Sequence, residues 1–394
     1  MAAHKVNRAM RISFLIQGLD VGGAEIQLYY LVRGLLKHNH YIQLAYFYAG
    51  GALEKKFQEI EGLDLNCLWR KSGYDFSVIR TYVSMLRRAD IQIVQGYMPP
   101  ANSLALIAGV FAKVPVKVAS LRASNWDYRE TTGTFIYFHL DRILGNGIAD
   151  AYLANSNRGK YFHISKGFDD RKIFVIHNGI DTEVIKRNKQ DKKKEFYKEL
   201  KILPNSLVIG LIARIAPIKD HKTFLEAVKI VHKEYPEAVF LIVGGGAPSL
   251  MDDLRRLTKE LGVEEKVIFA GMRNDVPELL QIIDIVCSSS SHGEAFSNSI
   301  AEAMAAGKPV IVTDVGDMAE VVKDGECGFV IPPRHPKALA KRIIEFLSDE
   351  ETRKTMGAMA RERIEKNYAI DSLIKKTEQV YQCLLEKKTG YNAR

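Results

Sequence analysis

Two cations stand five residues apart in the segment from Gly210 to Asp220. A short apolar run ends near Arg214, and a helix is expected after Asp220, a residue type that favours helix N-caps. Arginine offers a planar fork of donors and lysine a mobile point charge. Together Arg214 and Lys219 can hold a diphosphate and stabilise the charge that develops as it leaves. The alternative interpretation is an exposed basic loop.

A pair of carboxylates, Glu294 and Glu302, follows with seven residues between them. Glu294 comes after a serine-rich turn, and Glu302 falls inside a helix expected from about Asn298 to Ala306. Carboxylates placed in this way can accept hydrogen bonds from vicinal hydroxyls of a nucleotide sugar, as acidic residues do on ribose. They could instead be partners of the helix dipole.

Two glycine clusters each follow an apolar run. One contains Gly18, Gly22 and Gly23, and the other is Gly244–Gly246. Backbone amides at the helix start after the first cluster suit an anion. The spacing there is not GxGxxG, and no acidic residue follows the second expected strand, so a dinucleotide site is disfavoured. Each cluster is equally consistent with a tight turn after a strand.

The elements that must position these residues form two series of short apolar strands alternating with amphipathic helices. This alternation predicts an α/β fold with parallel sheets covered on both faces. The expected strands are 12–16, 42–47, 91–95, 116–120, 151–154 and 173–176, then 208–212, 239–243, 267–270, 285–288, 309–313 and 328–331. A polar run at 186–194 separates the series. Two doubly wound domains facing each other would place a ligand cleft between the carboxyl ends of both sheets.

Size and composition agree with a two-domain globular protein. The chain has 394 residues, of which 47% are hydrophobic and 26% charged, and that length suits two domains better than one. No apolar segment has the length of a membrane span, and the apolar stretch near residue 12 is interpreted as a strand rather than a signal peptide. The four cysteines lie far apart without a CxxC pair, which disfavours disulfides or zinc and favours a cytoplasmic location.

The net charge of +9 belongs to the first half of the chain. Residues 1–190 hold 25 Lys and Arg against 16 Asp and Glu, whereas residues 191–394 hold 31 of each. Such a field favours a phosphate-rich partner, namely an anionic membrane face, a lipid diphosphate or nucleic acid. A solvated surface that is simply basic is the alternative.

Taken in order, these segments make the chain resemble the retaining glycosyltransferases of family 4, which have the GT-B fold. The resemblance runs from the first strand to beyond residue 330. Its carriers are Gly22–Glu25, His177–Asp181, Ala213–Arg214, Lys219–Asp220, Val243–Gly246, the Glu294 to Glu302 spacing and Ala306–Val310. It implies two Rossmann-like domains facing a central cleft: a basic acceptor-side domain at 1–185, a linker at 186–204 and a donor-side domain at 205–368. A C-terminal helix at 369–394 would cross back to the N-terminal domain.

The resemblance also implies the activity. A sugar would pass from a UDP-sugar, or from a GDP-sugar, to a glycan or a polyprenyl-diphosphate-linked acceptor, with retention at the anomeric carbon. Arg214 and Lys219 would bind the diphosphate, Glu302 the ribose and Glu294 the transferred sugar, while Val276 would meet the base through its main chain. The catalytic residues implied are Arg214, Lys219, Glu294 and Arg122. The donor-binding residues implied are Gly22, Gly23, Arg214, Lys219, Gly245, Arg273, Val276, Glu294, Phe296, Ser297, Asn298 and Glu302.

No cofactor or metal ion is expected. The family usually works without a bound metal, and no acidic DxD triplet follows an expected strand. Arg214 and Lys219 can supply the positive charge that a metal ion would otherwise provide.

One position departs from the family pattern. Many members carry a histidine after the strand that corresponds to 116–120, and here Arg122 falls about there. Arginine cannot act as a base near neutral pH, but it can hold a sugar hydroxyl or an acceptor phosphate. We therefore interpret the histidines of this domain, His139, His163 and His177, as structural.

Aromatic side chains beside cations mark the stretch from Trp126 to Phe138, with Arg122, Arg129 and Arg142 around it. They suit a lipid-linked acceptor and a peripheral position on the inner face of the plasma membrane. A helix whose aromatics fill the core is the alternative. Two rival functions are a sugar-nucleotide epimerase of the same architecture and a non-catalytic polyanion binder. No nucleic-acid-binding signature is present in the sequence.

Overall fold

The computed structural model describes residues 9–71, 75, 77–122, 132–187 and 192–390. The chain divides into two compact units, one of residues 1–179 with 370–394 and one of residues 180–369. The N-terminal part of the first unit therefore ends at Gly179, before the predicted boundary at 185. The predicted linker 186–204 contains a helix, α8 (Lys193–Glu199), whose Phe196 is buried in the core of the second unit.

The first unit is built on a seven-stranded parallel sheet with the order β3-β2-β1-β4-β5-β6-β7. Its strands are β1 (Arg11–Gly18), β2 (Tyr41–Tyr48), β3 (Leu63–Cys67), β4 (Ile93–Tyr97), β5 (Val116–Leu121), β6 (Ala151–Ala154) and β7 (Ile173–Val175). Its helices are α1 (Gly23–Lys37), α2 (Glu54–Gln58), α3 (Ser77–Arg88), α4 (Ala101–Ala112), α5 (Thr132–Ile148), α6 (Asn157–Ser165) and α16 (Ile370–Thr389).

Helices cover both faces of this sheet because successive residues of each strand point to opposite sides. Phe14 of β1 packs into a core shared with α1 and α16, and Leu15 packs into another core shared with α3 and α4. Strand β3 lies at the sheet edge and was not predicted. It is half-buried, and its apolar residues alternate with Asp64 and Asn66, so it lacks the continuous apolar run of the inner strands.

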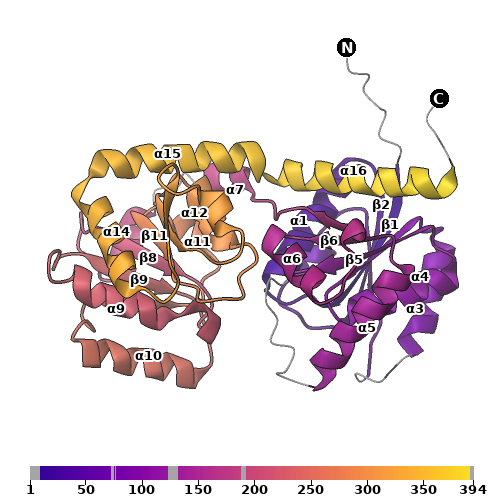
Figure 1. The fold of residues 1–394 in the computed structure, drawn as a ribbon, viewed down its shortest axis with the longest axis horizontal. Helices are drawn as coiled ribbons and strands as arrows, with labels where there is room; N and C mark the ends of the chain where they lie inside the picture. The colour runs from indigo at the N-terminus through magenta and orange to yellow at the C-terminus, as the bar shows by residue number, and fades with distance from the viewer. Residues whose placement is uncertain (1–8, 72–74, 76, 123–131, 188–191, 391–394) are drawn as a thin grey trace, which may run out of the picture. The chain divides into compact units, whose positions relative to one another are not determined.

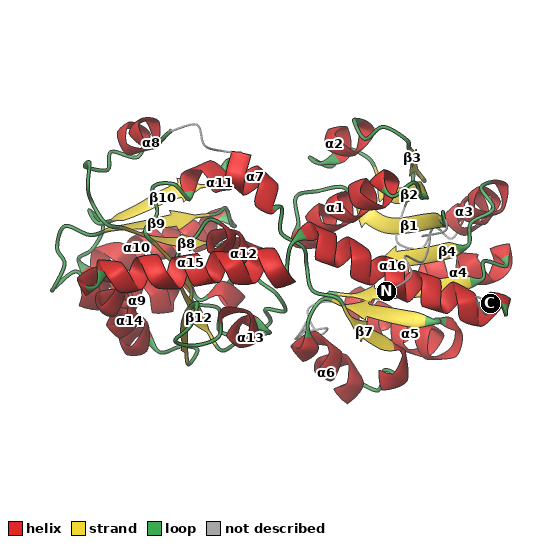
Figure 2. Cartoon of the chain, turned by 90° about the horizontal axis from the view of Figure 1, so that it is seen from above, coloured by secondary structure: helices red, strands yellow, loops and turns green. Residues whose placement is uncertain are grey.

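The second unit repeats the plan with a six-stranded parallel sheet of order β10-β9-β8-β11-β12-β13. Its strands are β8 (Val208–Ile212), β9 (Val239–Val243), β10 (Val267–Gly271), β11 (Ile285–Ser288), β12 (Val310–Thr313) and β13 (Gly328–Ile331). Its helices, besides α8, are α7 (Thr182–Arg187), α9 (His221–Val231), α10 (Pro248–Leu261), α11 (Val276–Leu279), α12 (Asn298–Ala305), α13 (Met318–Val322), α14 (Pro336–Ser348) and α15 (Glu350–Asn367). Figure 2 shows the strands of each unit between layers of helix.

Both sheets place their first strand near the middle and reverse strand order beside it, which is the doubly wound topology. The predicted α/β class with two parallel sheets is confirmed. In such sheets the loops after the carboxyl ends of the central strands hold ligands. Within the described residues, no helix combines the length and the apolar character needed to cross a bilayer.

Candidate functional site

The loop after β8 presents Arg214 and Lys219 at the carboxyl end of the sheet. Arg214 is exposed, and none of the described residues forms a hydrogen bond or ion pair with its side chain. A short 3-10 turn, Pro217–Lys219, then leads into α9. Asp220 is the N-cap of α9, as predicted, and its carboxylate accepts from the Thr223 backbone N–H and hydroxyl. The loop is thus fixed at its far end while Arg214 stays available to a ligand.

Lys219 and Glu294, 75 residues apart in the chain, form an ion pair between Nζ and Oε2. Their side chains are only 18% and 12% exposed. The Ser290 hydroxyl donates to the same Glu294 oxygen at 3.0 Å, and the Ser289 hydroxyl donates to the Lys219 carbonyl at 2.9 Å. An ammonium group has three donors, so the Lys219 ammonium retains donors for a further anion.

The serine-rich turn after β11 is the part of this site that sequence reasoning did not assign. Ser291 N–H donates to the Ile218 carbonyl at 2.9 Å, and Thr313 at the end of β12 donates its hydroxyl to the Ser290 carbonyl at 2.7 Å. These bonds lock the turn between the β8 loop and β12. The run of four serines at 288–291 was the available signal, since short hydroxyl side chains readily bond to nearby backbone.

Gly244 and Gly246 are required by the close approach of two loops. A Cβ on Gly244 would lie 2.0 Å from the Ala213 carbonyl oxygen, and one on Gly246 would lie 2.6 Å from that of Ile215. The backbone amide of Ile215 donates to the Gly245 carbonyl at 2.8 Å, which ties the loops together. A Cβ on Gly245 would make only ordinary contact with its neighbours. The cluster therefore serves packing at two of its three positions.

Glu302 lies on α12, and none of the described residues donates a hydrogen bond to its carboxylate. Burial raises the pKa of this carboxyl to about 7. A half-buried carboxylate that none of the described residues binds is costly, and hydroxyl donors from a ligand would relieve that cost. This environment suits the role that the sequence predicts for Glu302.

The segment that precedes α12 is held from within the unit. Phe296 is buried, and its ring centroid lies 5.8 Å from that of Tyr368. The Ser297 backbone N–H points to the Met318 sulfur at 3.2 Å, so a donor that used this amide would have to replace that weak bond. Asn298 begins α12 and is partly exposed. The predicted backbone contacts of these residues stay predictions.

Arg273 serves the fold of the second unit. Its guanidinium bonds to Asp275 at 2.6 and 2.8 Å, forms an ion pair with Glu199 of α8, and lies 5.6 Å from the Phe196 ring centroid. These carboxylates raise the pKa of Arg273 above its ordinary value. This side chain thus fastens α8, and its predicted contact with the donor stays a prediction. Val276 begins the short helix α11 and is partly exposed.

In the first unit, Gly22 and Gly23 begin α1 as predicted, but an acidic side chain already lies there. A Cβ on Gly22 would come within 2.2 Å of a carboxylate oxygen of Glu25, which stands in the first turn. Partial burial raises the pKa of Glu25. This carboxylate interacts with the positive end of the helix dipole, where an anion would otherwise bind. The predicted phosphate contact of these glycines stays a prediction.

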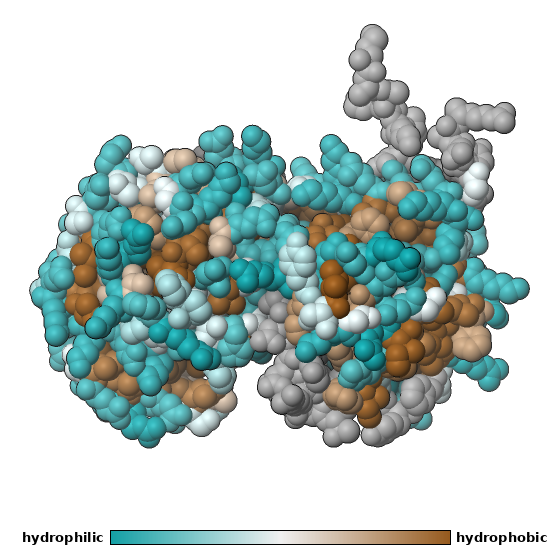
Figure 3. All heavy atoms as spheres, in the orientation of Figure 1, coloured by the Kyte–Doolittle hydropathy of each residue, from teal (hydrophilic) through white to brown (hydrophobic). Residues whose placement is uncertain are grey.

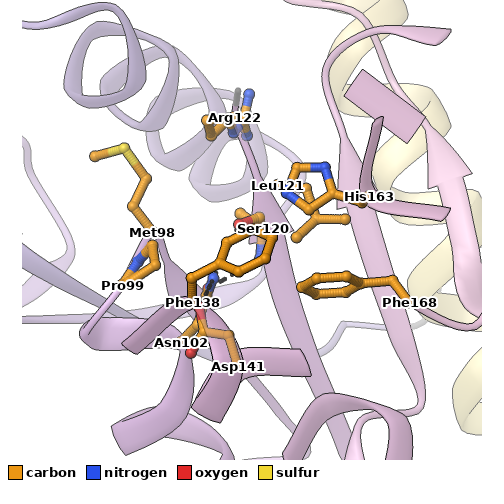
Figure 4. A pocket seen from close by; sticks show the side chains of 10 residues that line it. All are labelled: Met98, Pro99, Asn102, Ser120, Leu121, Arg122, Phe138, Asp141, His163 and Phe168. Carbon is orange, nitrogen blue, oxygen red and sulfur yellow. Dashed lines mark hydrogen bonds between the residues drawn. The ribbon is translucent and has the colours of Figure 1, made fainter. Parts of the chain in front are cut away.

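Arg122 stands at the end of β5 beside a cavity of about 180 Å³ within the first unit. Its Nη1 donates to the Asn178 side chain at 3.1 Å, and the guanidinium lies 4.9 Å from the Tyr97 ring centroid. Figure 4 shows the cavity between Met98 and Phe168. The predicted aromatic residues Trp126 and Tyr128, with Arg129, lie outside the described residues.

Two buried ionisable groups line this cavity. Asp141 accepts from the side chains of Asn102 and Ser103, and burial raises its pKa to about 6. His163 is 2% exposed, and burial lowers its pKa to about 4, so the ring is neutral at pH 7. One ring nitrogen bonds to the Gly159 carbonyl at 2.8 Å and must carry the proton, because a carbonyl only accepts. His163 therefore combines a structural bond with a ring edge on the cavity.

Comparison with known protein families assigns the chain to a family. A model described as Glycosyltransferase Family 4 matches residues 21–184, and one described as Glycosyl transferases group 1 matches residues 191–363. The chain is a family 4 glycosyltransferase. The two matches adjoin near the division between the two compact units.

Curated relatives of this glycosyltransferase agree. It is 30% identical over 223 residues to the N-acetyl-alpha-D-glucosaminyl L-malate synthase of Bacillus anthracis, which covers 56% of each chain. It is 26% identical over 311 residues to an Escherichia coli UDP-Gal:alpha-D-GlcNAc-diphosphoundecaprenol alpha-1,3-galactosyltransferase, which covers 77% of this chain and 78% of the relative. These names give no support to the epimerase or the polyanion-binding alternative.

Solved structures show the same fold. Anabaena HepE in complex with UDP has a TM-score of 0.82 at 23% identity, covering 95% of this chain and all of that one. WaaG, a glycosyltransferase of lipopolysaccharide biosynthesis, has a TM-score of 0.71 at 16% identity, covering 94% of this chain. The glycosyltransferase described here therefore has the GT-B fold.

Proposed function

We propose that this glycosyltransferase moves a sugar from a UDP-sugar to a glycan or polyprenyl-diphosphate-linked acceptor, with retention and without a bound metal. The observation that carries the proposal is the cluster at the carboxyl edge of the second sheet. There the Lys219–Glu294 pair lies on loops adjoining exposed Arg214, and α12 carries the carboxylate of Glu302, which none of the described residues binds. The complex of HepE with UDP supports UDP as the nucleotide, and the name of the Escherichia coli relative supports a UDP-sugar and a lipid-linked acceptor.

Each member of the cluster has a chemical role in this proposal. Arg214 and Lys219 bind the diphosphate and stabilise its charge as the bond to the anomeric carbon breaks. Glu302 accepts hydrogen bonds from the ribose hydroxyls and Glu294 from the sugar hydroxyls. Because two cations can offset the charge of the leaving UDP, no divalent ion is needed for this step. The acceptor hydroxyl oxygen then bonds to the anomeric carbon on the face that UDP has left, and its proton passes to a phosphate oxygen of the departing UDP.

Thermal unfolding with UDP tests the donor site. A ligand at about 100 times its dissociation constant stabilises the folded state by about 2.7 kcal/mol, which raises the melting temperature by several degrees. We expect UDP to do so for the wild type and not for Arg214→Ala combined with Lys219→Ala. The matched control replaces two cations of α10, Arg256→Ala with Lys259→Ala, and should keep the full shift. An equal shift in the cluster variant would contradict the donor site, and a larger shift with GDP or ADP would change the nucleotide.

Turnover assays test the rest of the proposal. We expect transfer from a UDP-sugar to a polyprenyl-diphosphate sugar in detergent, with the anomeric configuration retained in the product by NMR. Activity should survive EDTA. Loss of activity in EDTA that Mg²⁺ or Mn²⁺ restores would contradict metal independence. An inverted product would contradict retention while leaving the donor site in place.

A further inference from the structure

Large apolar side chains are exposed on two neighbouring helices of the first unit. Val110 and Phe111 at the end of α4 are 47% and 61% exposed, and Ile136 and Ile143 of α5 are 56% and 63% exposed. Helices α4 and α5 pack against each other, and Figure 3 shows hydrophobic side chains gathered over them. We call these four residues the α4–α5 face. Exposed large apolar side chains that gather on adjoining helices mark an interaction site more often than isolated exposed residues do.

Positive charge borders the α4–α5 face. Arg80, Arg87 and Arg88 of α3 and Lys113 after α4 are all exposed. The Arg87 Nη2 donates to the Phe111 carbonyl at 2.6 Å, which holds this guanidinium against the apolar side chains. Helix α3 packs beside α4, so the cations of α3 lie on a helix that adjoins the apolar residues of α4.

Among the described residues of α3, α4 and α5, acidic side chains are scarce. Helices α3 and α4 contain no Asp or Glu, and the single acid of α5, Asp141, is 3% exposed and bonded to Asn102 and Ser103. The nearest acid after α5, Asp150, is paired with Lys117 and Lys388 at 3.4 and 2.6 Å. Asp90, which follows α3, is the exposed acid closest in sequence to the cations.

We infer that the α4–α5 face docks on an anionic lipid bilayer. The apolar side chains would enter the boundary between headgroups and acyl chains, and the cations of α3 and Lys113 would contact the lipid phosphates. A second copy of the chain is a poorer occupant, because a symmetric contact would place like charges against each other. The inference deepens the proposed function and rests on it for the lipid-linked nature of the acceptor.

Sedimentation with vesicles tests this inference. We expect the wild type at low salt to sediment with vesicles of phosphatidylglycerol and phosphatidylcholine, and to stay in solution with phosphatidylcholine alone. The variant Phe111→Ser, Ile136→Ser, Ile143→Ser should bind about tenfold more weakly or worse. The variant Arg80→Gln, Arg88→Gln, Lys113→Gln should lose a similar amount, since each cation near an anionic surface contributes on the order of a few-fold in affinity.

The matched control removes apolar side chains that are exposed on the second unit, by Val184→Ser, Leu203→Ser and Met359→Ser, and it should bind like the wild type. The inference would be overturned if the wild type stayed in solution with anionic vesicles, or if the control variant lost as much vesicle binding as the face variant. It would also be overturned if the wild type were a dimer that did not bind vesicles and the face variant were a monomer. Stabilisation by UDP, measured on the same proteins, keeps the two claims apart. If UDP stabilises the protein but the protein does not bind vesicles, only the docking inference fails. If the protein binds vesicles but UDP does not stabilise it, the proposed function fails.

Discussion

The fold raises the pKa of Glu302, a residue of the proposed donor site, and this shift can be measured. Its pKa of about 7 lies above the ordinary value of 4.5. Between those values the folded state keeps a proton that the unfolded state releases, so stability falls as pH rises from 4.5 to 7, by up to about 3 kcal/mol. We expect Glu302→Gln to remove this decline, measured by urea unfolding at several pH values. A wild type and a variant with parallel pH profiles would contradict the raised pKa.

Ligand binding should act on the same carboxyl group. Ribose hydroxyls that donate to Glu302 favour its ionised form, so UDP binding should release about half a proton from this group near pH 7. Calorimetry in two buffers of different ionisation enthalpy measures that release. The UDP phosphate also titrates in this pH range, so the proton release measured with Glu302→Gln is subtracted as the reference. Equal proton release in both proteins would show that the ribose does not contact Glu302.

At this scale the sequence predicted the residue types of the site better than their partners. Arg214, Lys219, Glu294 and Glu302 all lie at the carboxyl edge of the second sheet or on α12 beside it. The pairing of Lys219 with Glu294, and the engagement of Arg273 by Glu199, link residues 75 and 74 positions apart. Such contacts depend on strand order, which local spacing does not encode.

Among the elements, the loop between β12 and α13 decides where Glu294 lies. Gly316 has a φ of 65°, and a Cβ there would come within 2.3 Å of the Glu294 carbonyl oxygen. We expect Gly316→Ala to destabilise the protein by about 3 kcal/mol, from left-handed backbone strain together with the backbone collision. The same variant should weaken UDP binding because it displaces Glu294. Chemical unfolding and UDP titration measure the two effects.

Gly262, at the end of α10, is the matched control position for Gly316. It ends α10 with a φ of 69°, and a Cβ there would have nothing within 4 Å. Gly262→Ala therefore carries the backbone strain alone, about 1 kcal/mol, with UDP binding unchanged. Equal losses of stability in Gly316→Ala and Gly262→Ala, with normal UDP binding by both, would contradict a role in UDP binding for the packing of this loop against Glu294.

The long inner strands and amphipathic helices were predictable because their patterns are local. Edge strand β3 and helix α8 were not, since β3 is short and half polar and α8 shows one buried side chain, Phe196, within a highly charged run. The structural role of Phe196 depends on the core of the second unit, in which its side chain is buried.

In the whole molecule, α16 returns from the end of the chain to complete the core of the first unit. Tyr381 is fully buried there, and its hydroxyl donates to Gln95 of β4. Glu378 of the same helix bonds to His38 and His40 at 2.7 and 2.8 Å. The C-terminal helix is therefore a structural part of a unit whose remaining residues lie more than 190 positions earlier.

We expect Tyr381→Ala to lower the unfolding free energy of the first unit by about 3–5 kcal/mol, because it leaves a large cavity. Tyr381→Phe, which removes only the hydroxyl, should cost about 1 kcal/mol. Scanning calorimetry with and without UDP measures both, since UDP should raise the transition of the second unit. A Tyr381→Ala protein that melts like the wild type would contradict the role of α16.

The sequence by itself determined the α/β class, the two-part organisation, the order of the inner strands and helices, and the candidate chemistry of Arg214, Lys219, Glu294 and Glu302, since all of these follow from local pattern and residue type. Only the tertiary structure decided that Gly244 and Gly246 serve loop packing, that Arg273 fastens α8, and that Glu25 lies against the start of α1. It also decided that Val110, Phe111, Ile136 and Ile143 remain exposed. Apolar residues in a helix predict burial, and only the neighbours supplied by the fold determine which of them are covered.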